Sequence, residues 1–145
     1  AKAIVKERSL SPIETTLHLA KVVSEAHPAW EKGRHPATRA FQAIRIFVNN
    51  ELGDLEVFLA AVLDALKVGG RMVIISFHSL EDRMVKRFIK HHVRGDQLPA
   101  SVPVTEDQLN RRLKMIGKAV RATASEVEAN ARSRSAIMRI AEKIA

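Results

Sequence analysis

Apolar residues recur at helical spacing over the first third of the chain and predict three helices. Residues 1–10 have the pattern of the end of a helix. A second helix is expected to start in the segment SPIE at 11–14, with Ser as the N-cap and Pro in the first turn, and to run to about Glu25. His35-Pro36 is expected to open the third. Its core-facing stripe comprises Ala37, Ala40, Phe41, Ile44, Phe47 and Val48.

The middle of the chain has the pattern of a helix followed by a buried strand. We expect a break at Gly53 and then a helix over about 54–67, whose inner surface is almost entirely apolar. Gly69 and Gly70 suit the end of that helix, where a positive φ is needed. Residues 72–75 (MVII) are apolar without alternation, which is typical of a strand covered on both faces.

The remaining residues predict one more helix and the other strands of an α/β sheet. Ser79 with Asp82 three residues later resembles a capping box, so a helix is expected over about 79–93. Residues 95–108 are expected to form a surface loop that ends in a turn of helix near 105–107. The runs 113–120 and 135–140 alternate in part and predict two strands that pair antiparallel at a sheet edge, with a short helix near 124–130 between them.

The polar segment between the first strand and the following helix is the first candidate for a functional site. In open α/β sheets, ligands bind in the crevice beyond the carboxyl ends of the strands. We therefore expect a substrate pocket bordered by Ser76, Phe77, His78 and Ser79. The alternative is structural: Ser79 only caps the helix and His78 only satisfies a buried carbonyl.

The amino-acid composition indicates which classes of binding partner suit this protein. The 145 residues carry a net charge of +8, which favours an anionic partner, with nucleic acid ahead of an anionic membrane. Aromatic residues make up only 4% of the chain, which argues against an aromatic stacking platform for single-stranded RNA. There is no cysteine, apolar run of membrane-spanning length or signal-peptide pattern, and these absences suit a cytoplasmic protein.

Basic side chains supply the candidates for contact with RNA phosphates. One group lies on the polar face of the third helix, beside Gln42 and Asn49. This face is either exposed to solvent or turned into a cleft, and the sequence is compatible with both. A second group lies on the 79–93 helix, again either a solvated stripe or an RNA contact. A third precedes the last strand. The candidates are Arg39, Arg45, Lys86, Arg87, Arg132 and Arg134. Trp30 is either a packing residue or a base-stacking one.

Several kinds of chemistry have no counterpart in the sequence. It contains no G-x-G-x-x-G, no Walker A motif and no G-x-S-x-G. His91 and His92 are adjacent and cannot easily share a metal, and the other histidines are isolated. The residues therefore predict no metal site and assign no catalytic residue.

Two long motifs and one short motif resemble one known family. They are HPATRAFQAIRI at 35–46, GGRMVIISFHSLEDRMVKRF at 69–88 and ARSRS at 131–135. Together they are similar to the C-terminal half of the bacterial 16S ribosomal RNA cytosine-N(4)-methyltransferase family, also called the MraW or RsmH family. The resemblance extends over essentially the whole chain.

The resemblance implies the closing half of a class I methyltransferase sheet, which is Rossmann-like, plus helices from an inserted helical subdomain. Residues 1–34 would end that subdomain and 35–145 would complete the sheet. The implied reaction transfers the methyl group of S-adenosylmethionine to the N4 amine of a cytidine in 16S rRNA of the small ribosomal subunit, in the bacterial cytoplasm.

The family's N-terminal half carries the cofactor motifs, and none of them is in this sequence. The resemblance therefore implies no cofactor-binding residue here, and we expect the 145 residues alone to be inactive. The alternative functions are a non-catalytic basic RNA-binding fragment and a scaffold piece that pairs through its sheet edge. The oligomeric state is left open.

Overall fold

The computed structural model describes residues 1–27, 35–96, 105 and 109–145. They fall into two compact units, residues 1–51 and 52–145. Trp30 and most of the predicted 95–108 loop lie outside the described residues. Within the described part of the chain, no helix is both long enough and apolar enough to cross a membrane.

The first unit consists of α1 (Lys2–Leu10), α2 (Thr16–Glu25) and α3 (Thr38–Asn49). The prediction that α2 starts within residues 11–14 is wrong. The Thr15 side chain accepts a hydrogen bond from the backbone N–H of His18 at 3.1 Å, so Thr15 is the N-cap. The helix expected from His35-Pro36 begins at Thr38, because residues 36 and 37 form a turn.

The end of α3 differs from the prediction in two ways. The break falls at Asn50, which adopts a left-handed backbone with φ 52°, whereas Gly53 lies inside α4 (Glu51–Ala65). Phe47 and Val48 were expected in a core, but their exposed fractions are 87% and 73%. In the described part of the first unit, no element covers this end of the stripe.

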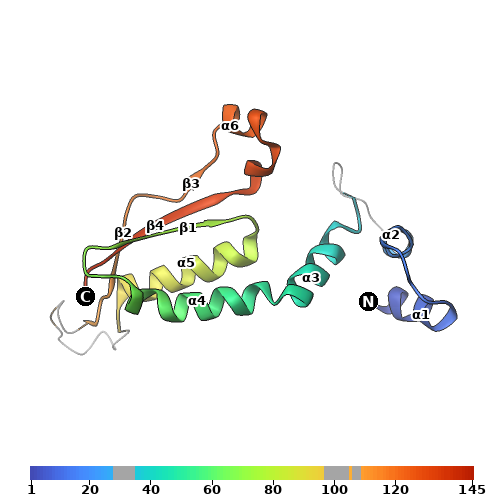
Figure 1. Ribbon diagram of the computed structural model, residues 1–145, viewed down its shortest axis with the longest axis horizontal. Coiled ribbons are helices and arrows are strands. Elements are labelled where there is room, and N and C mark those ends of the chain that lie inside the picture. The colour runs from blue at the N-terminus through green and yellow to red at the C-terminus, as the bar shows by residue number, and fades with distance from the viewer. Residues whose placement is uncertain (28–34, 97–104, 106–108) are drawn as a thin grey trace. The chain divides into compact units, whose positions relative to one another are not determined.

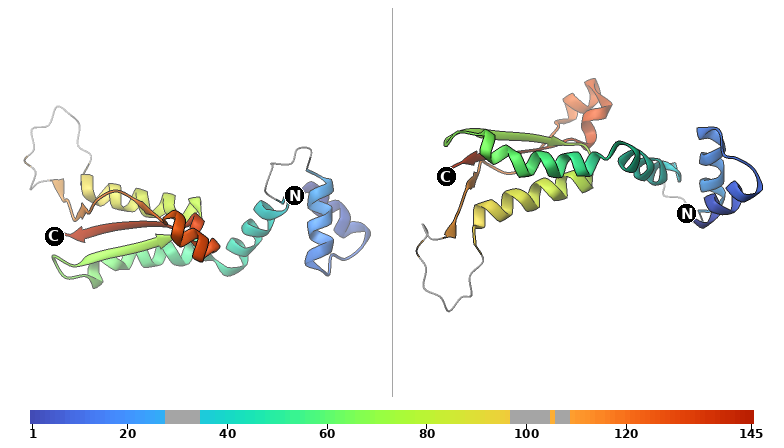
Figure 2. Two further views of the ribbon diagram at one scale, coloured as in Figure 1. Left: turned by 90° about the horizontal axis from the view of Figure 1, so that it is seen from above. Right: turned by 60° about the horizontal axis from the view of Figure 1, so that its bottom comes forward.

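The second unit holds a sheet with helices on one face (Figures 1 and 2). After α4 come β1 (Arg71–Ser76), α5 (Ser79–Arg94), β2 (Leu113–Met115) and β3 (Val120–Arg121). They are followed by α6 (Ala124–Ala129), the 3-10 helix η2 (Ala131–Ser135) and β4 (Ile137–Lys143). The α/β class and the short helix before the last strand are thus confirmed. The predicted strand 113–120 is divided into β2 and β3, and the strand predicted at 135–140 is β4, which begins at Ile137.

Strand β4 lies at the centre of the sheet and not at its edge. The strand order is β1-β4-β2, and β3 also pairs with β4. Every one of these pairings is antiparallel, with Ser76 opposite Ile137 and Arg71 opposite Glu142 in the β1 register. The predicted antiparallel pairing is correct, but the expected edge position is wrong for β4, because its longer ladder lets it bond on both sides.

The sheet has one covered face and one exposed face. Met72 and Ser76 point to the inner face, where α4 and α5 pack (Figure 2), and are only 4% and 3% exposed. Val73 and Ile75 point the other way and are 54% and 53% exposed. The prediction that β1 is covered on both faces is therefore not met within the described residues. The inner core comprises Val62, Leu63, Met72, Val85, Ile89, Leu113 and Ala141.

The turn between α4 and β1 is held by glycines and by the end of β4. Gly69 has φ +81°, and a Cβ on Gly70 would lie 2.8 Å from the Lys67 carbonyl oxygen, so both positions suit glycine. The Lys143 ammonium donates to the carbonyls of Leu63 and Leu66 at 2.7 and 2.9 Å. This lysine caps the C-terminus of α4, whose own last turn carries no basic residue.

We expect Lys143→Met to lower the free energy of unfolding by about 1–3 kcal/mol, because it removes two charge-assisted hydrogen bonds from the end of α4. Urea titration of the 145-residue chain measures this loss. The control is Lys114→Met, since Lys114 is exposed on β2 and forms neither bond. An equal loss in the two variants would contradict the capping role.

Candidate functional site

The carboxyl end of β1 turns into α5 through a capped polar segment. The backbone N–H groups of Phe77 and His78 donate to Glu81 Oε2 at 2.9 and 3.2 Å. In return, the Glu81 N–H donates to His78 Nδ1 at 3.4 Å. The N-cap is therefore His78 with Glu81 at N3, and the predicted Ser79–Asp82 capping box is wrong by one residue.

The four predicted pocket residues differ in accessibility. Ser76 is 3% exposed, and the His78 side chain is 8% exposed. Phe77 is 54% exposed, and Ser79 also lies at the surface. His78 Nδ1 accepts the hydrogen bond from the Glu81 N–H, and His78 Nε2 lies 3.4 Å from Glu81 Oε1. Phe77 and Ser79 are thus accessible to a ligand, whereas Ser76 is buried and His78 caps the helix.

A bidentate ion pair joins the first turn of α5 to β4. Arg139 donates from Nε to Asp82 Oδ1 at 2.7 Å and from Nη2 to Oδ2 at 3.1 Å. The two side chains are only 17% and 16% exposed. The hydrogen bonds from Arg139 are the main cause of a lowered pKa at Asp82, and the charges of Arg139, Lys86 and Arg121 add to them.

The sheet register brings two predicted RNA-binding residues to the same end of the sheet as the β1–α5 turn. Ser76 pairs with Ile137, the first residue of β4, and η2 directly precedes that strand. Arg132 and Arg134 lie exposed on η2. The η2 turn is held by the buried Ser133, whose hydroxyl donates to the Asn130 carbonyl at 2.8 Å.

The other predicted RNA-binding residues lie further away along the chain. Lys86 and Arg87 are exposed on α5, about 11–12 Å along the helix from Ser79 at 1.5 Å per residue. Arg39 and Arg45 are exposed on α3, in the first unit. Arg45 forms a bidentate ion pair with Glu51 at 2.8 and 3.1 Å. Contact of these four residues with RNA stays a prediction.

Sequence reasoning missed the Asp82–Arg139 pair. A signal for it was present, because Arg139 is the single charged residue in the apolar run SAIMRI. A lone charge on the covered face of a strand needs a partner of opposite sign. The identity of that partner depends on which helix packs on the strand, and only the fold decides this.

The whole chain matches one family of known proteins. The model of the MraW methylase family matches residues 1–144. The chain belongs to the MraW methylase family. This result confirms the resemblance seen in the sequence motifs, and the order β1-β4-β2 with an antiparallel central strand is compatible with part of a Rossmann-like sheet.

Two relatives in this family carry the name ribosomal RNA small subunit methyltransferase H. The relative from Marinomonas sp. is 57% identical over 144 residues, which are 99% of this chain and 46% of the relative. The relative from Chromohalobacter salexigens is 61% identical over 145 residues, which are 99% of this chain and 44% of the relative. The chain therefore spans slightly less than half the length of these family members.

We expect His78→Ala to lower the free energy of unfolding by about 1 kcal/mol, because it removes the side-chain cap of α5. Ser79→Ala is the matched control and should change stability by less than about 0.5 kcal/mol, since Ser79 is exposed and is not the N-cap. Thermal or urea unfolding followed by circular dichroism compares the two. A larger loss in Ser79→Ala would overturn the assignment of the cap.

The Asp82–Arg139 pair predicts a pH-dependent contribution to stability. The pKa of Asp82 is lowered in the folded chain, so the pair stabilises above the ordinary aspartate pKa of about 4 and is lost as pH falls through the lower folded value. Asp82→Asn should therefore cost about 1–3 kcal/mol near neutral pH, and this difference should shrink below about pH 4.

Urea titrations at neutral and acidic pH measure both effects. The control is Asp64→Asn, because Asp64 is 78% exposed in its ion pair with Arg112 and should contribute less than about 1 kcal/mol. A constant difference between wild type and Asp82→Asn at every pH would show that the charge of Asp82 is not what matters.

Proposed function

We propose that the chain is the C-terminal part of an S-adenosylmethionine-dependent methyltransferase that acts on the N4 amine of a cytidine in small-subunit ribosomal RNA. The observation that carries this proposal is the family match over residues 1–144, joined to relatives that are named small subunit methyltransferases. The net charge of +8 suits an RNA substrate. The cytoplasm is the expected compartment.

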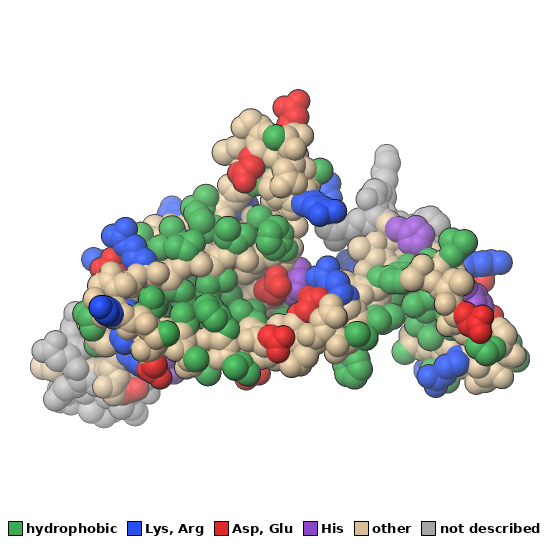
Figure 3. Space-filling view, in the orientation of Figure 1, with side chains coloured by type: hydrophobic (Ala, Val, Ile, Leu, Met, Phe, Trp, Pro, Cys, Tyr) green, Lys and Arg blue, Asp and Glu red, His purple; other side chains and the backbone are tan. Residues whose placement is uncertain are grey.

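The exposed apolar surface of the second unit supports the view that further polypeptide completes the fold. Figure 3 shows hydrophobic side chains gathered over β1 and between β1 and α4. On α4, Val57 and Phe58 are 71% and 48% exposed, so apolar side chains of this helix also face outward. We propose that the missing half of the protein covers this surface, that residues 35–145 close its sheet and that residues 1–34 end its helical subdomain.

We propose that the site for S-adenosylmethionine lies outside this chain. The sequence has no glycine-rich phosphate loop, and the carboxylate of Glu81, beside the end of β1, caps α5. We therefore assign the cofactor to the half of the protein that this chain lacks. This assignment is why we propose that the isolated chain is inactive.

The role that remains for the β1–α5 turn is to shape the pocket for the target cytidine. A base that is modified in this way leaves its stack and enters a pocket, where planar side chains contact its faces. Phe77 offers an exposed ring and Ser79 an exposed hydroxyl, and the hydrogen bonds from the backbone of Phe77 and His78 to Glu81 fix the turn between them. Arg132 and Arg134, at the same end of the sheet, would contact neighbouring phosphates.

Complementation tests this proposal. The 145-residue chain is co-expressed with the segment by which the Marinomonas relative extends beyond the matched region. Transfer of a labelled methyl group from S-adenosylmethionine to small ribosomal subunits that lack the modification is then measured, with N4-methylcytidine identified by mass spectrometry. We expect transfer by the combined halves and none by the chain alone.

A variant pair tests whether the exposed sheet face is the joining surface. Ile75→Asp should prevent complementation, whereas Val5→Asp introduces the same charge at an equally exposed valine of α1 (53% and 52%) and should not. Activity of the isolated chain would overturn the assignment of the cofactor site. Absence of activity in soluble combined halves would favour the alternative of a non-catalytic RNA-binding fragment.

A further inference from the structure

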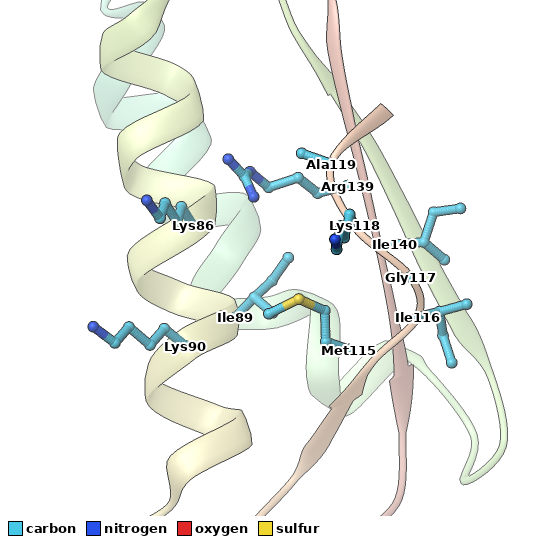
Figure 4. Close-up of a pocket in the computed structure, with 10 residues that line it drawn as sticks. All are labelled: Lys86, Ile89, Lys90, Met115, Ile116, Gly117, Lys118, Ala119, Arg139 and Ile140. Carbon is cyan, nitrogen blue, oxygen red and sulfur yellow. The ribbon is translucent and has the colours of Figure 1, made fainter. Parts of the chain in front are cut away.

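A cavity of about 210 Å³ lies between α5 and the β2–β3 connection, on the covered side of the sheet (Figure 4). We call it the α5–β2 pocket. Its lining residues all belong to the second unit and come from three segments: α5, residues 115–119 and the centre of β4. They are Lys86, Ile89, Lys90, Met115, Ile116, Gly117, Lys118, Ala119, Arg139 and Ile140.

The interior of the pocket is apolar. The Met115 side chain extends from β2 toward Ile89 of α5, and these two side chains occupy the space between helix and strand (Figure 4). Ile116 and Ile140 point away from α5, so they line the pocket mainly with backbone. The volume is below the roughly 300–1,000 Å³ of sites for drug-sized ligands, so the pocket suits a single small ring system.

The rim of the pocket is cationic. Lys118 lies on the strand side of the pocket, whereas the side chains of Lys86 and Lys90 extend from α5 to the side away from Met115 and Arg139 (Figure 4). Within the part of the chain that the structure describes, no carboxylate forms an ion pair with these three lysines. The nearby Asp82 is engaged by Arg139, so its charge is already compensated. The pocket therefore joins a small apolar slot to positive charges, which matches a base with flanking phosphates.

Arg139 adds a feature that favours a planar ligand. Its side chain projects from β4 toward α5 into the pocket (Figure 4), and two hydrogen bonds to Asp82 hold the guanidinium in one orientation. A fixed guanidinium plane is a surface on which nucleobases stack, even where aromatic side chains are scarce.

We propose that the α5–β2 pocket binds one nucleotide of single-stranded RNA, with the base against Met115 and the Arg139 guanidinium and an adjacent phosphate against Lys118. The proposal rests on the proposed function only in taking RNA as the partner. The pocket is a second contact, further along α5 than the β1–α5 turn, because its α5 residues begin at Lys86, about 11 Å along the helix from Ser79. Binding there would anchor the RNA strand at a distance from the modified base.

Methionine methyl resonances test the position of the base in the unmodified chain. The sequence has four methionines, and three report on distinct places: Met115 in the pocket, Met72 in the core and Met138 on the exposed sheet face. On titration with a short single-stranded RNA, the Met115 methyl signal should shift, while those of Met72 and Met138 should not. An abasic ribose-phosphate strand of equal length should leave Met115 unshifted.

A pair of charge reversals tests the phosphate contacts. Lys118→Glu should weaken RNA binding about tenfold at low salt and reduce its salt slope by about one. Lys114→Glu changes the net charge equally, but its side chain lies on the opposite sheet face from Met115, and it should have less than about a twofold effect. Fluorescence anisotropy with a labelled RNA measures both. Equal effects would show that only the overall charge matters.

A variant that fills the pocket tests the contact with the base separately from the contact with phosphate. Ala119→Trp adds bulk at an exposed lining residue without changing charge. It should weaken binding of RNA but not of the abasic strand. Three results would each overturn the proposal. The first is that Ala119→Trp leaves the binding of both strands unchanged, and the second is that the Met115 signal does not shift. The third is that the wild-type chain binds anionic phospholipid vesicles and not RNA. Failure here with methyl transfer intact in the complementation assay would leave the proposed function standing.

Discussion

The hydrogen-bond ladder of β4 is the interaction on which the rest of the second unit depends. This strand is the last element of the chain, yet it lies at the centre of the sheet and pairs with β1, β2 and β3. Its ladder therefore brings together segments that are up to about 70 residues apart in the sequence. The contacts of its side chains continue this role: Arg139 pairs with the first turn of α5, and Lys143 caps the last turn of α4.

These contacts determine how the β1–α5 turn presents its side chains. Arg139 engages Asp82 from the sheet side, and Glu81 satisfies two backbone N–H groups from within the helix. The turn is thus held from two directions, which is how a binding surface keeps its geometry before a ligand arrives. The exposed ring of Phe77 follows from this arrangement, because the strand alternation points it away from the inner face that buries Ser76.

The two faces of the sheet have different consequences for function. The inner face is complete, and the α5–β2 pocket lies beside it with a cationic rim. The outer face and the outer side of α4 are apolar and exposed, which is unusual for a finished surface. In the proposed enzyme, the outer face receives the missing half of the fold, and the basic side of α5 is left for RNA. The surface for assembly and the surface for RNA binding are thus on different parts of the second unit.

The family membership, the α/β class and most of the helices follow from the sequence alone. Helical periodicity located α1 and α5 and most of α4, and the motifs at 35–46 and 69–88 identified the family. Local interactions along the chain encode these features, so they can be predicted without knowledge of the fold. The first residues of the helices were predicted less accurately, because several side chains near the starts of α2 and α5 are able to act as N-caps. Only the hydrogen bonds in the folded structure show that Thr15 and His78 are the caps.

The tertiary structure alone decided the central place of β4, the Asp82–Arg139 pair and the α5–β2 pocket. Each depends on contacts between residues far apart in the chain, such as the 57 positions between Asp82 and Arg139. Periodicity cannot specify such contacts, because a short alternating strand pairs equally well at an edge or at the centre until its neighbours are placed. The sequence determined which elements form, and the packing of α4 and α5 against β4 decided which side chains meet.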